Sequence, residues 1–143
     1  MKNTCLKVVT FGVYDMFHFG HLRLFRNIKK QFGEESFLTV CVQSSDFILK
    51  YKPESKIFYS TEERVEMIKN IRCVDEVKIY ENIFPDITEV EFDVWVKGPD
   101  QEHKGFQDAI KWCNENNKEV FIMPRTEGIS SSYIKTMVQD LEK

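Results

Sequence analysis

The sequence predicts an α/β fold, a Rossmann-like, doubly wound sheet of five parallel strands with helices on both faces. Short apolar runs, typical of parallel strands covered on both faces, alternate five times with helical patterns. The polar segments that carry reactive side chains follow these strands, where open sheets of this kind bind their ligands. At 143 residues the chain is long enough for one core, so we expect a single domain over 1–143.

Apolar runs place the strands, and helical patterns occupy the segments between them. The five expected strands are Leu6–Phe11, Ser36–Val42, Val74–Tyr80, Phe92–Lys97 and Val120–Met123. The expected helices are His21–Phe32, Phe47–Lys50, Ser60 to about Ile71, a short helix within 82–91, Phe106–Asn116, and about Ser131 to Leu141. Between the fourth strand and the next helix, the polar segment Gln101–Gly105 is expected to be a surface loop.

Local signals support the ends of these helices. Gly33 suits the end of the first helix, and Ser60 with Glu63 forms a capping box. Pro85 suits the first position of the short helix, and Ser130 is the expected N-cap of the last one. The polar side of the first helix is expected to carry Arg23, Arg26, Lys29 and Lys30.

Composition narrows the class of protein. The net charge of −3 argues against general nucleic-acid binding but allows a local basic pocket for a small anion. No apolar run approaches the ~20 residues that span a bilayer, and the N-terminus lacks a signal-peptide core, so we expect a cytoplasmic protein without a membrane partner. Cys5, Cys41, Cys73 and Cys113 are widely spaced, and reduced, buried thiols are expected. Trp95 and Trp112 lie in strand and helix patterns and are expected in the core.

The segment Gly12–His21 is the first candidate site. It joins an apolar strand to a helix, and backbone N–H groups at such a junction favour phosphate. His18 and His21 stand three residues apart and share one face of the turn. They could be core or capping residues, and a zinc site would need more ligands. We favour an electrostatic clamp, in which imidazole N–H groups stabilise phosphate charge.

A second candidate site is the segment from Arg125 to Ser132. It supplies one guanidinium for phosphate, the flexible Gly128 and three hydroxyls at the start of the last helix. An ordinary capped loop is the alternative. Because the segment from Arg125 to Ser132 follows the fifth strand, we expect it at the same edge of the sheet as His18 and His21. There it would form a second phosphate-binding site.

Further charged residues could reach a phosphorylated ligand. Lys50, Lys52 and Lys56 lie on the loop after the second strand and could neutralise a triphosphate or a phosphorylated acceptor, or simply be solvated. Arg72, before the third strand, could also contact an anion. Asp15 could hold a metal or orient the turn.

Two motifs carry a resemblance that covers nearly the whole chain in order. His18-Phe19-Gly20-His21 resembles the H-x-G-H signature of the nucleotidyltransferase superfamily. The run Arg125-Thr-Glu-Gly-Ile-Ser-Ser131 resembles the R-T-E-G-I-S-[ST] signature of its cytidylyltransferase branch, and Ile71–Val77 resembles a segment of the same branch. Together the motifs indicate CTP as the nucleotide. The short chain favours the small bacterial glycerol-3-phosphate enzymes over the longer choline-phosphate enzymes.

The resemblance implies a nucleotidyltransferase-type fold and a reaction. A phosphate oxygen of the acceptor attacks the α-phosphorus of CTP, diphosphate leaves and a CDP-alcohol forms for a cell-surface polymer. Mg²⁺ accompanies the triphosphate, and members are commonly homodimers. The implied catalytic residues are His18, His21, Lys52 and Arg125. The implied CTP contacts are Val13, Tyr14, His18, His21, Asp100, Arg125, Thr126, Gly128, Ile129, Ser130 and Ser131. The implied acceptor contacts are Asp15, Lys50, Lys52 and Arg72.

Three departures from the family pattern bear mainly on the acceptor. Val13-Tyr14 replaces Thr-Phe, the lysine loop is longer, and Lys97-Gly98-Pro99-Asp100 replaces Gly-Asp-Asp. The last form also resembles that of sugar-phosphate adenylyltransferases, which lack the Arg125 signature. Alternatives to glycerol 3-phosphate are therefore phosphocholine, phosphoethanolamine or another polyol or sugar phosphate. An adenylyltransferase and a non-catalytic nucleotide-binding module are further rivals.

Overall fold

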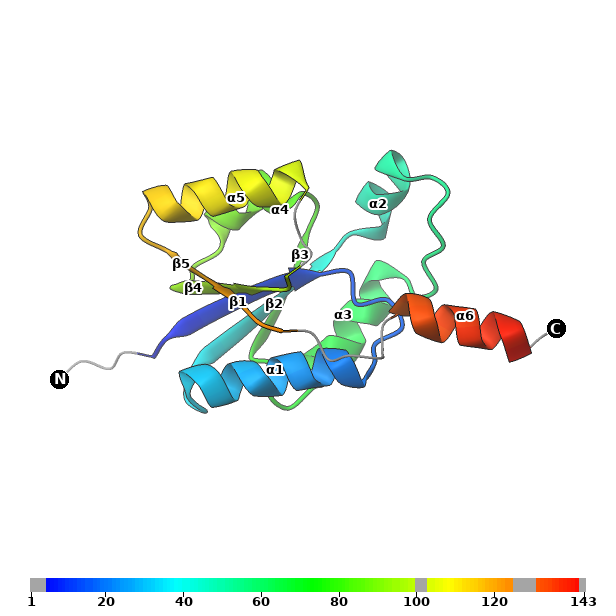
Figure 1. The fold of residues 1–143 in the computed structure, drawn as a ribbon, viewed down its shortest axis with the longest axis horizontal. Helices are drawn as coiled ribbons and strands as arrows, with labels where there is room; N and C mark the ends of the chain where they lie inside the picture. Colours follow the sequence, from blue (N-terminus) through cyan, green and yellow to red (C-terminus); the bar gives the residue numbers. More distant parts are fainter. Residues whose placement is uncertain (1–4, 100–102, 125–130, 142–143) are drawn as a thin grey trace.

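The chain folds around one sheet of five parallel strands, which confirms the predicted fold class (Figure 1). The computed structural model describes residues 5–99, 103–124 and 131–141. The strands are β1 (Lys7–Gly12), β2 (Phe37–Gln43), β3 (Glu76–Tyr80), β4 (Val94–Lys97) and β5 (Glu119–Ile122), in the order β3-β2-β1-β4-β5. The order reverses at β1, so the carboxyl end of β1 is where a ligand site is expected.

Helices cover both faces of the sheet (Figure 1). One face carries α1 (Phe19–Phe32) and α3 (Thr61–Lys69), and the other carries α4 (Ile83–Asp86), the 3₁₀ turn η1 (Ile87–Glu89) and α5 (Lys104–Glu115). The short helix α2 (Ser45–Tyr51) stands beyond the carboxyl ends of the strands, and α6 (Ser131–Leu141) ends the described chain. In the described ranges, no helix has the length and apolar character needed to cross a membrane.

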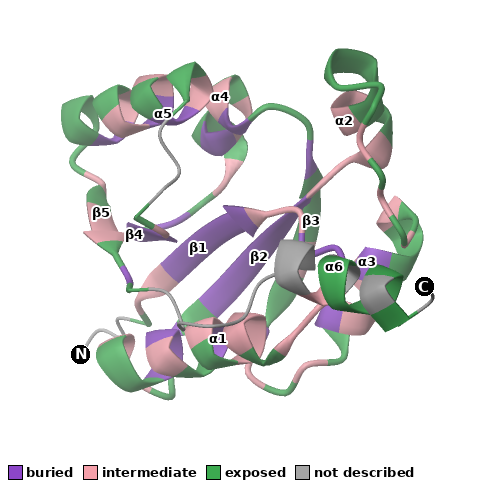
Figure 2. Ribbon diagram, turned by 45° about the vertical axis from the view of Figure 1, so that its right-hand side comes forward, coloured by how far each residue is buried: buried purple, intermediate pink, exposed green. Residues whose placement is uncertain are grey.

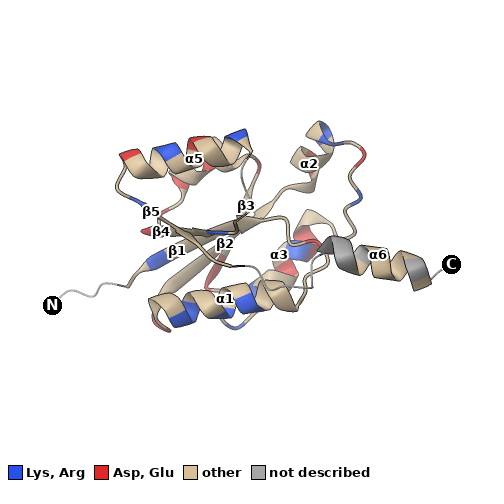
Figure 3. Cartoon of the chain, viewed as in Figure 1, with Lys and Arg blue, Asp and Glu red and all other residues tan. Residues whose placement is uncertain are grey.

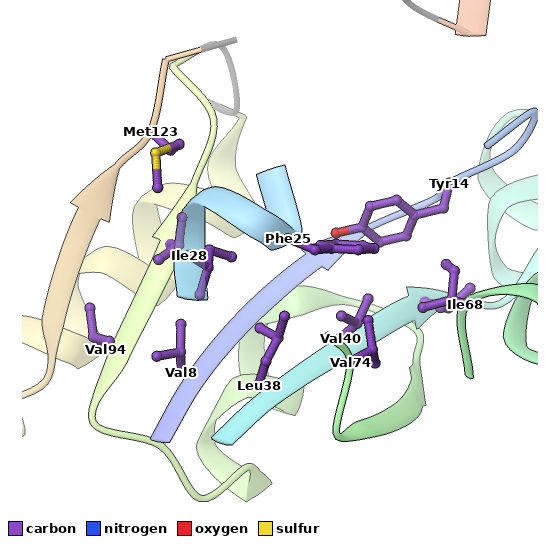
Figure 4. Packing of buried hydrophobic residues seen from close by; sticks show 12 residues of the cluster. Val8, Tyr14, Phe25, Ile28, Leu38, Val40, Ile68, Val74, Val94 and Met123 are labelled. Carbon is purple, nitrogen blue, oxygen red and sulfur yellow. The ribbon is translucent and has the colours of Figure 1, made fainter. Parts of the chain in front are cut away.

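The central strands β1, β2 and β4 are largely apolar because each contributes buried residues to two cores. Alternate residues of β1 face opposite sides, so Val8 packs under α1 and α3 whereas Val9 packs under α4 and α5. Figure 2 shows the buried residues concentrated on the central strands, and Figure 4 shows Phe25 and Ile68 in the first core. Trp95 is fully buried in the second core, as predicted, and Trp112 packs partly buried against it.

Two basic side chains are buried against the sheet, and both escaped the prediction. Lys29 was expected on the polar side of α1, but its ammonium is buried and donates to the carboxylate of Asp75 at 2.8 Å and to the carbonyl of Ser36. Arg64 in α3 is completely buried. An apolar stripe predicts which face of a helix is buried. It does not predict whether a charged residue at the edge of that face has hydrogen-bond partners in the sheet.

Several boundaries differ from the predicted ones because polar residues cap the elements. The helix α1 begins at Phe19 because His18 is its N-cap, and α5 begins at Lys104 because His103 is its N-cap. The expected loop over 101–105 is therefore wrong for its last two residues, and Gln101 and Glu102 lie outside the described ranges. Pro85 is the third residue of α4, but Phe84 before it has extended backbone angles (φ −117°, ψ 124°), so helical geometry begins at Pro85, as expected. All four cysteines are free, and Cys5 is exposed rather than buried.

Candidate active site

The β1–α1 turn, residues 13–18, lies at the carboxyl end of the central strand. Its backbone passes twice through the left-handed region, at Tyr14 with φ 58° and at Met16 with φ 54°. This path directs the ring of Tyr14 into the core, against Phe25 (Figure 4). A Cβ on Gly12 would lie 2.7 Å from that ring, so only glycine fits before the turn. Burial of the phenol raises the pKa of Tyr14.

His18 and His21 form a reciprocal cap at the start of α1. Nδ1 of His18 accepts a hydrogen bond from the backbone N–H of Gly20 at 3.0 Å, and Nδ1 of His21 accepts one from the N–H of His18 at 3.2 Å. The two rings stack with centroids 3.8 Å apart. An imidazole whose Nδ1 is an acceptor carries its proton on Nε2 in the neutral form. The capping interpretation and the clamp are therefore compatible, since the cap orients each Nε2–H as a donor.

The carboxylate of Asp15 fixes the turn to the segment before α3. Its two oxygens accept the backbone N–H groups of Phe58 at 2.8 Å and Tyr59 at 3.0 Å, and the residue is 5% exposed. This geometry matches the turn-orienting alternative. Contact with an acceptor or with Mg²⁺ stays a prediction.

Arg64 is the structural residue that the sequence analysis missed. Its guanidinium donates at 2.8 Å to the carbonyls of Val13 and Gln43, and at 2.6 Å to the hydroxyl of Ser45. Burial lowers the pKa of Arg64, and the nearby Asp15 carboxylate opposes that shift. One side chain thus joins the β1–α1 turn, the end of β2 and α2. The available signal was its position four residues before Ile68 on the apolar stripe of α3.

A cavity of about 930 Å³, here named the edge cavity, opens beside the β1–α1 turn. Its floor at the turn is formed by Gly12, Val13 and Asp15. Its apolar lining comprises Phe47, Ile48, Tyr51, Ile57, Tyr80, Ile83 and Phe106. Its basic and amide-bearing lining comprises Gln43, Lys52, Lys56, Asn82, His103 and Lys104.

The charge balance of the edge cavity favours an anion. Lys and Arg appear on the loop after α2 and at the start of α5, the two segments that flank it (Figure 3). Asp15 is the one acidic side chain among the described lining residues, and both of its oxygens accept backbone N–H groups. His103 lies opposite the lysine loop, and its pKa is lowered by burial and by the positive charge of Lys52.

The structure brings together some predicted residues and separates others. Val13, Asp15, Lys52 and Lys56 line the edge cavity. Lys50 does not line it, and its ammonium lies 5.5 Å from the centroid of the neighbouring Tyr51 ring. Their roles stay predictions.

Arg72 lies away from this site. It stands in the connection from α3 to the amino end of β3, so it lies at the opposite edge of the sheet from the β1–α1 turn. The structure therefore does not bring it to the cavity within one chain. Asp100, Arg125, Thr126, Gly128, Ile129 and Ser130 lie outside the described ranges, and Ser131 is the first residue of α6.

Comparison with known proteins decides the family. A family model described as cytidylyltransferase-like matches residues 9–137, a range that holds both histidines and the whole sheet except the start of β1. This chain belongs to the cytidylyltransferase-like family. A solved structure, titled a lipopolysaccharide core biosynthesis protein from Thermoplasma volcanium, aligns with a TM-score of 0.65 at 21% identity, covering 85% of this chain and 96% of its own. That likeness supports the fold alone.

The proteins to which this chain is similar carry different enzyme names. The chain is 37% identical over 138 residues to the glycerol-3-phosphate cytidylyltransferase of Bacillus subtilis, covering 94% of this chain and 98% of the relative. It is 30% identical over 118 residues to the FAD synthase of Methanohalophilus mahii, covering 80% and 79%. As a cytidylyltransferase-like protein it is a nucleotidyltransferase, and a nucleotide is one of its substrates.

Proposed function

We propose that the protein transfers CMP from CTP to glycerol 3-phosphate, forming CDP-glycerol and diphosphate for a cell-surface polymer. An oxygen of the acceptor phosphate bonds to the α-phosphorus while the bond to the oxygen of the leaving diphosphate breaks. The observation that carries the proposal is the stacked pair His18 and His21, whose Nδ1 atoms accept backbone N–H groups. The pair belongs to the β1–α1 turn, and Val13 and Asp15 of that turn line the edge cavity. The similarity to a glycerol-3-phosphate cytidylyltransferase supports the choice of acceptor.

The two histidines act as preorganised hydrogen-bond donors in this proposal. Because the cap fixes each ring, little reorganisation is needed when negative charge grows on the transferring and leaving phosphates. The rings stack with centroids 3.8 Å apart, which holds the two donors side by side. Donation from Nε2–H requires no protonation of either ring.

The edge cavity is the proposed acceptor site. It touches the β1–α1 turn through Val13, so an acceptor held there lies beside the nucleotide phosphates. Lys52 and Lys56 supply positive charge for the acceptor phosphate. The segment from Arg125 to Ser131 is proposed to bind CTP from the end of β5, as the family signature implies.

We propose that Mg²⁺ enters the site with the triphosphate of CTP. Within residues 5–99, 103–124 and 131–141, no group of three or more His, Cys, Asp or Glu side chains is arranged to hold a metal. The Asp15 oxygens accept backbone N–H groups. These residues fit a cation held chiefly by phosphate oxygens, which supplies neutralisation of the triphosphate charge when bound.

A larger acceptor is the second candidate, and the lining of the edge cavity favours it. Aromatic and aliphatic side chains form much of its lining, including Phe47 and Tyr51 from α2 and Phe106 from α5. A cavity of about 930 Å³ exceeds what glycerol 3-phosphate alone fills. A sugar or polyol phosphate with a ring would contact these side chains. The chain is also similar to a protein with a different enzyme name, the FAD synthase of Methanohalophilus mahii.

Diphosphate release across a panel of acceptors tests the proposal. CTP and Mg²⁺ are combined with glycerol 3-phosphate, phosphocholine, phosphoethanolamine and several sugar phosphates, and ATP replaces CTP as the control. We expect release with CTP and glycerol 3-phosphate. Release with CTP and only a ring-bearing phosphate would establish the second candidate, and release only with ATP would refute the choice of nucleotide.

A further inference from the structure

The third histidine of the chain repeats the geometry of His18 on the other face of the sheet. His103 is the N-cap of α5, and its Nδ1 accepts the backbone N–H of Gly105 at 3.2 Å, as His18 accepts that of Gly20. The starts of α1 and α5 both lie at the carboxyl edge of the strands (Figure 1). His103 thus also carries its proton on Nε2 when neutral and presents a hydrogen-bond donor at this edge.

The surroundings of His103 are built for close approach within the edge cavity. A Cβ on Gly105 would lie 3.0 Å from Oδ1 of Asn82 and 3.1 Å from Cε1 of His103, so glycine lets these two side chains lie over the first turn of α5. Asn82 makes no side-chain capping bond to α4, although it stands at that position. The Asn82 amide and the His103 ring both line the edge cavity, and both lie next to Gly105.

Positive charge faces this pair from the opposite wall. Lys52 and His103 both line the edge cavity. Burial lowers the pKa of His103, and the positive charge of Lys52 lowers it further, which favours the neutral ring. The other charged groups on the described lining are Lys56, Lys104 and the backbone-bound Asp15. An ammonium, an amide and an imidazole N–H around one apolar cavity form a set of donors that matches a phosphate dianion.

We propose that His103 binds the acceptor, donating from Nε2–H to its phosphate opposite the ammonium of Lys52. This inference rests on the proposed function, because it assigns the edge cavity to the phosphorylated acceptor. His103, the N-cap of α5, is thus an acceptor-binding residue, and His18 and His21 serve the nucleotide phosphates on the α1 side. The alternative is that His103 only caps α5.

Replacement of His103 by asparagine separates the two roles. Asparagine is among the best N-cap residues, so His103→Asn keeps the cap and removes the ring donor. Lys111→Asn is the matched control, because Lys111 is exposed on the outer side of α5. Calorimetry measures binding of glycerol 3-phosphate, inorganic phosphate and CTP, each alone, and thermal unfolding reports folding.

We expect His103→Asn to weaken binding of glycerol 3-phosphate and inorganic phosphate by about 10- to 100-fold, the scale of one hydrogen bond to a charged group. CTP affinity and Tm should match those of Lys111→Asn. In the wild type, either phosphate should shift the Nε2 resonance of His103, which is easily assigned among three histidines.

Three results would overturn the inference. If His103→Asn bound phosphate as tightly as the wild type, and phosphate did not shift the His103 resonance, His103 would serve only as the N-cap of α5. If His103→Asn lost affinity for CTP, His103 would belong to the nucleotide site. Failure of the proposed function is a separate result, since wild-type protein would then release no diphosphate from CTP and glycerol 3-phosphate. Binding of inorganic phosphate still tests the role of His103 in that case. If the wild-type protein bound no inorganic phosphate, the proposed role of His103 would be contradicted.

Discussion

Asp15 and Arg64 hold opposite sides of the same residue. The Asp15 carboxylate accepts the backbone N–H of Tyr59 at 3.0 Å, and Nε of Arg64 donates to the Tyr59 carbonyl at 3.3 Å. Arg64 also donates to the carbonyl of Val13 inside the β1–α1 turn. The segment before α3 and the β1–α1 turn are thereby fixed to each other, so the position of His18 depends on a buried arginine to which we assign no contact with substrate.

Replacing Arg64 by methionine should reduce both stability and activity. The change leaves the carbonyls of Val13 and Gln43 buried without their donor, and each such group costs about 1–3 kcal/mol. We expect a loss of about 2–5 kcal/mol in the free energy of unfolding, measured by urea titration. Lys69→Met at the exposed end of the same helix is the control, and an equal effect of both changes would contradict the assigned role.

The two roles of His18 should separate between two substitutions. His18→Asn retains an N-cap side chain but removes the Nε2–H donor, whereas His18→Ala removes both. We expect kcat to fall by about 10²–10³ in each, the scale of one transition-state donor. Only His18→Ala should also lose about 1 kcal/mol of stability. Wild-type turnover by His18→Asn would show that the ring is only a cap.

Lys52 and Lys50 form a matched pair two residues apart. Lys52 lines the edge cavity, whereas Lys50 does not and lies over Tyr51. Replacing each lysine by glutamine therefore removes one positive charge, either inside or outside the proposed acceptor site. Lys52→Gln should raise KM for the acceptor about tenfold or more, and Lys50→Gln should leave it within about twofold. Steady-state kinetics at saturating CTP measures both. Equal effects would mean that only the net charge of the loop matters.

Acid should weaken the fold partly through His103. Its pKa in the folded protein is lowered, chiefly by burial, from the ordinary value of 6.5. The unfolded chain therefore binds the proton more readily, and stability falls as the pH drops below about 6.5. The free energy of unfolding of His103→Asn should decline less between pH 7.5 and 5.5 than that of the wild type. Parallel pH profiles would contradict this cause.

The sheet was predictable because its signals are local. Runs such as Val8–Phe11 and Val94–Val96 are apolar on both faces, and their alternation with helical patterns leaves little choice of architecture. The two histidines were also predictable, since their spacing and the glycine between them place them at a helix start.

The rest depended on contacts between distant segments. Lys29 was expected on the polar side of its helix, and Arg64 was assigned no role. Their partners are distant in sequence: two carbonyls 20 or more residues away for Arg64, and Asp75 for Lys29. His103 was assigned to no site because it stands in a polar segment, 101–105, that was expected to be a surface loop. Its place opposite Lys52 follows from the packing of α5 against α4, which local sequence does not encode.

Direct observation of the product tests the central claim. The protein is incubated with CTP, Mg²⁺ and glycerol 3-phosphate, and ³¹P NMR follows the conversion of CTP phosphates into the diphosphate diester of CDP-glycerol and free diphosphate. We expect both products in equal amounts, and none with ATP in place of CTP. CTP left unchanged with glycerol 3-phosphate, or a product formed only from ATP, would contradict the account.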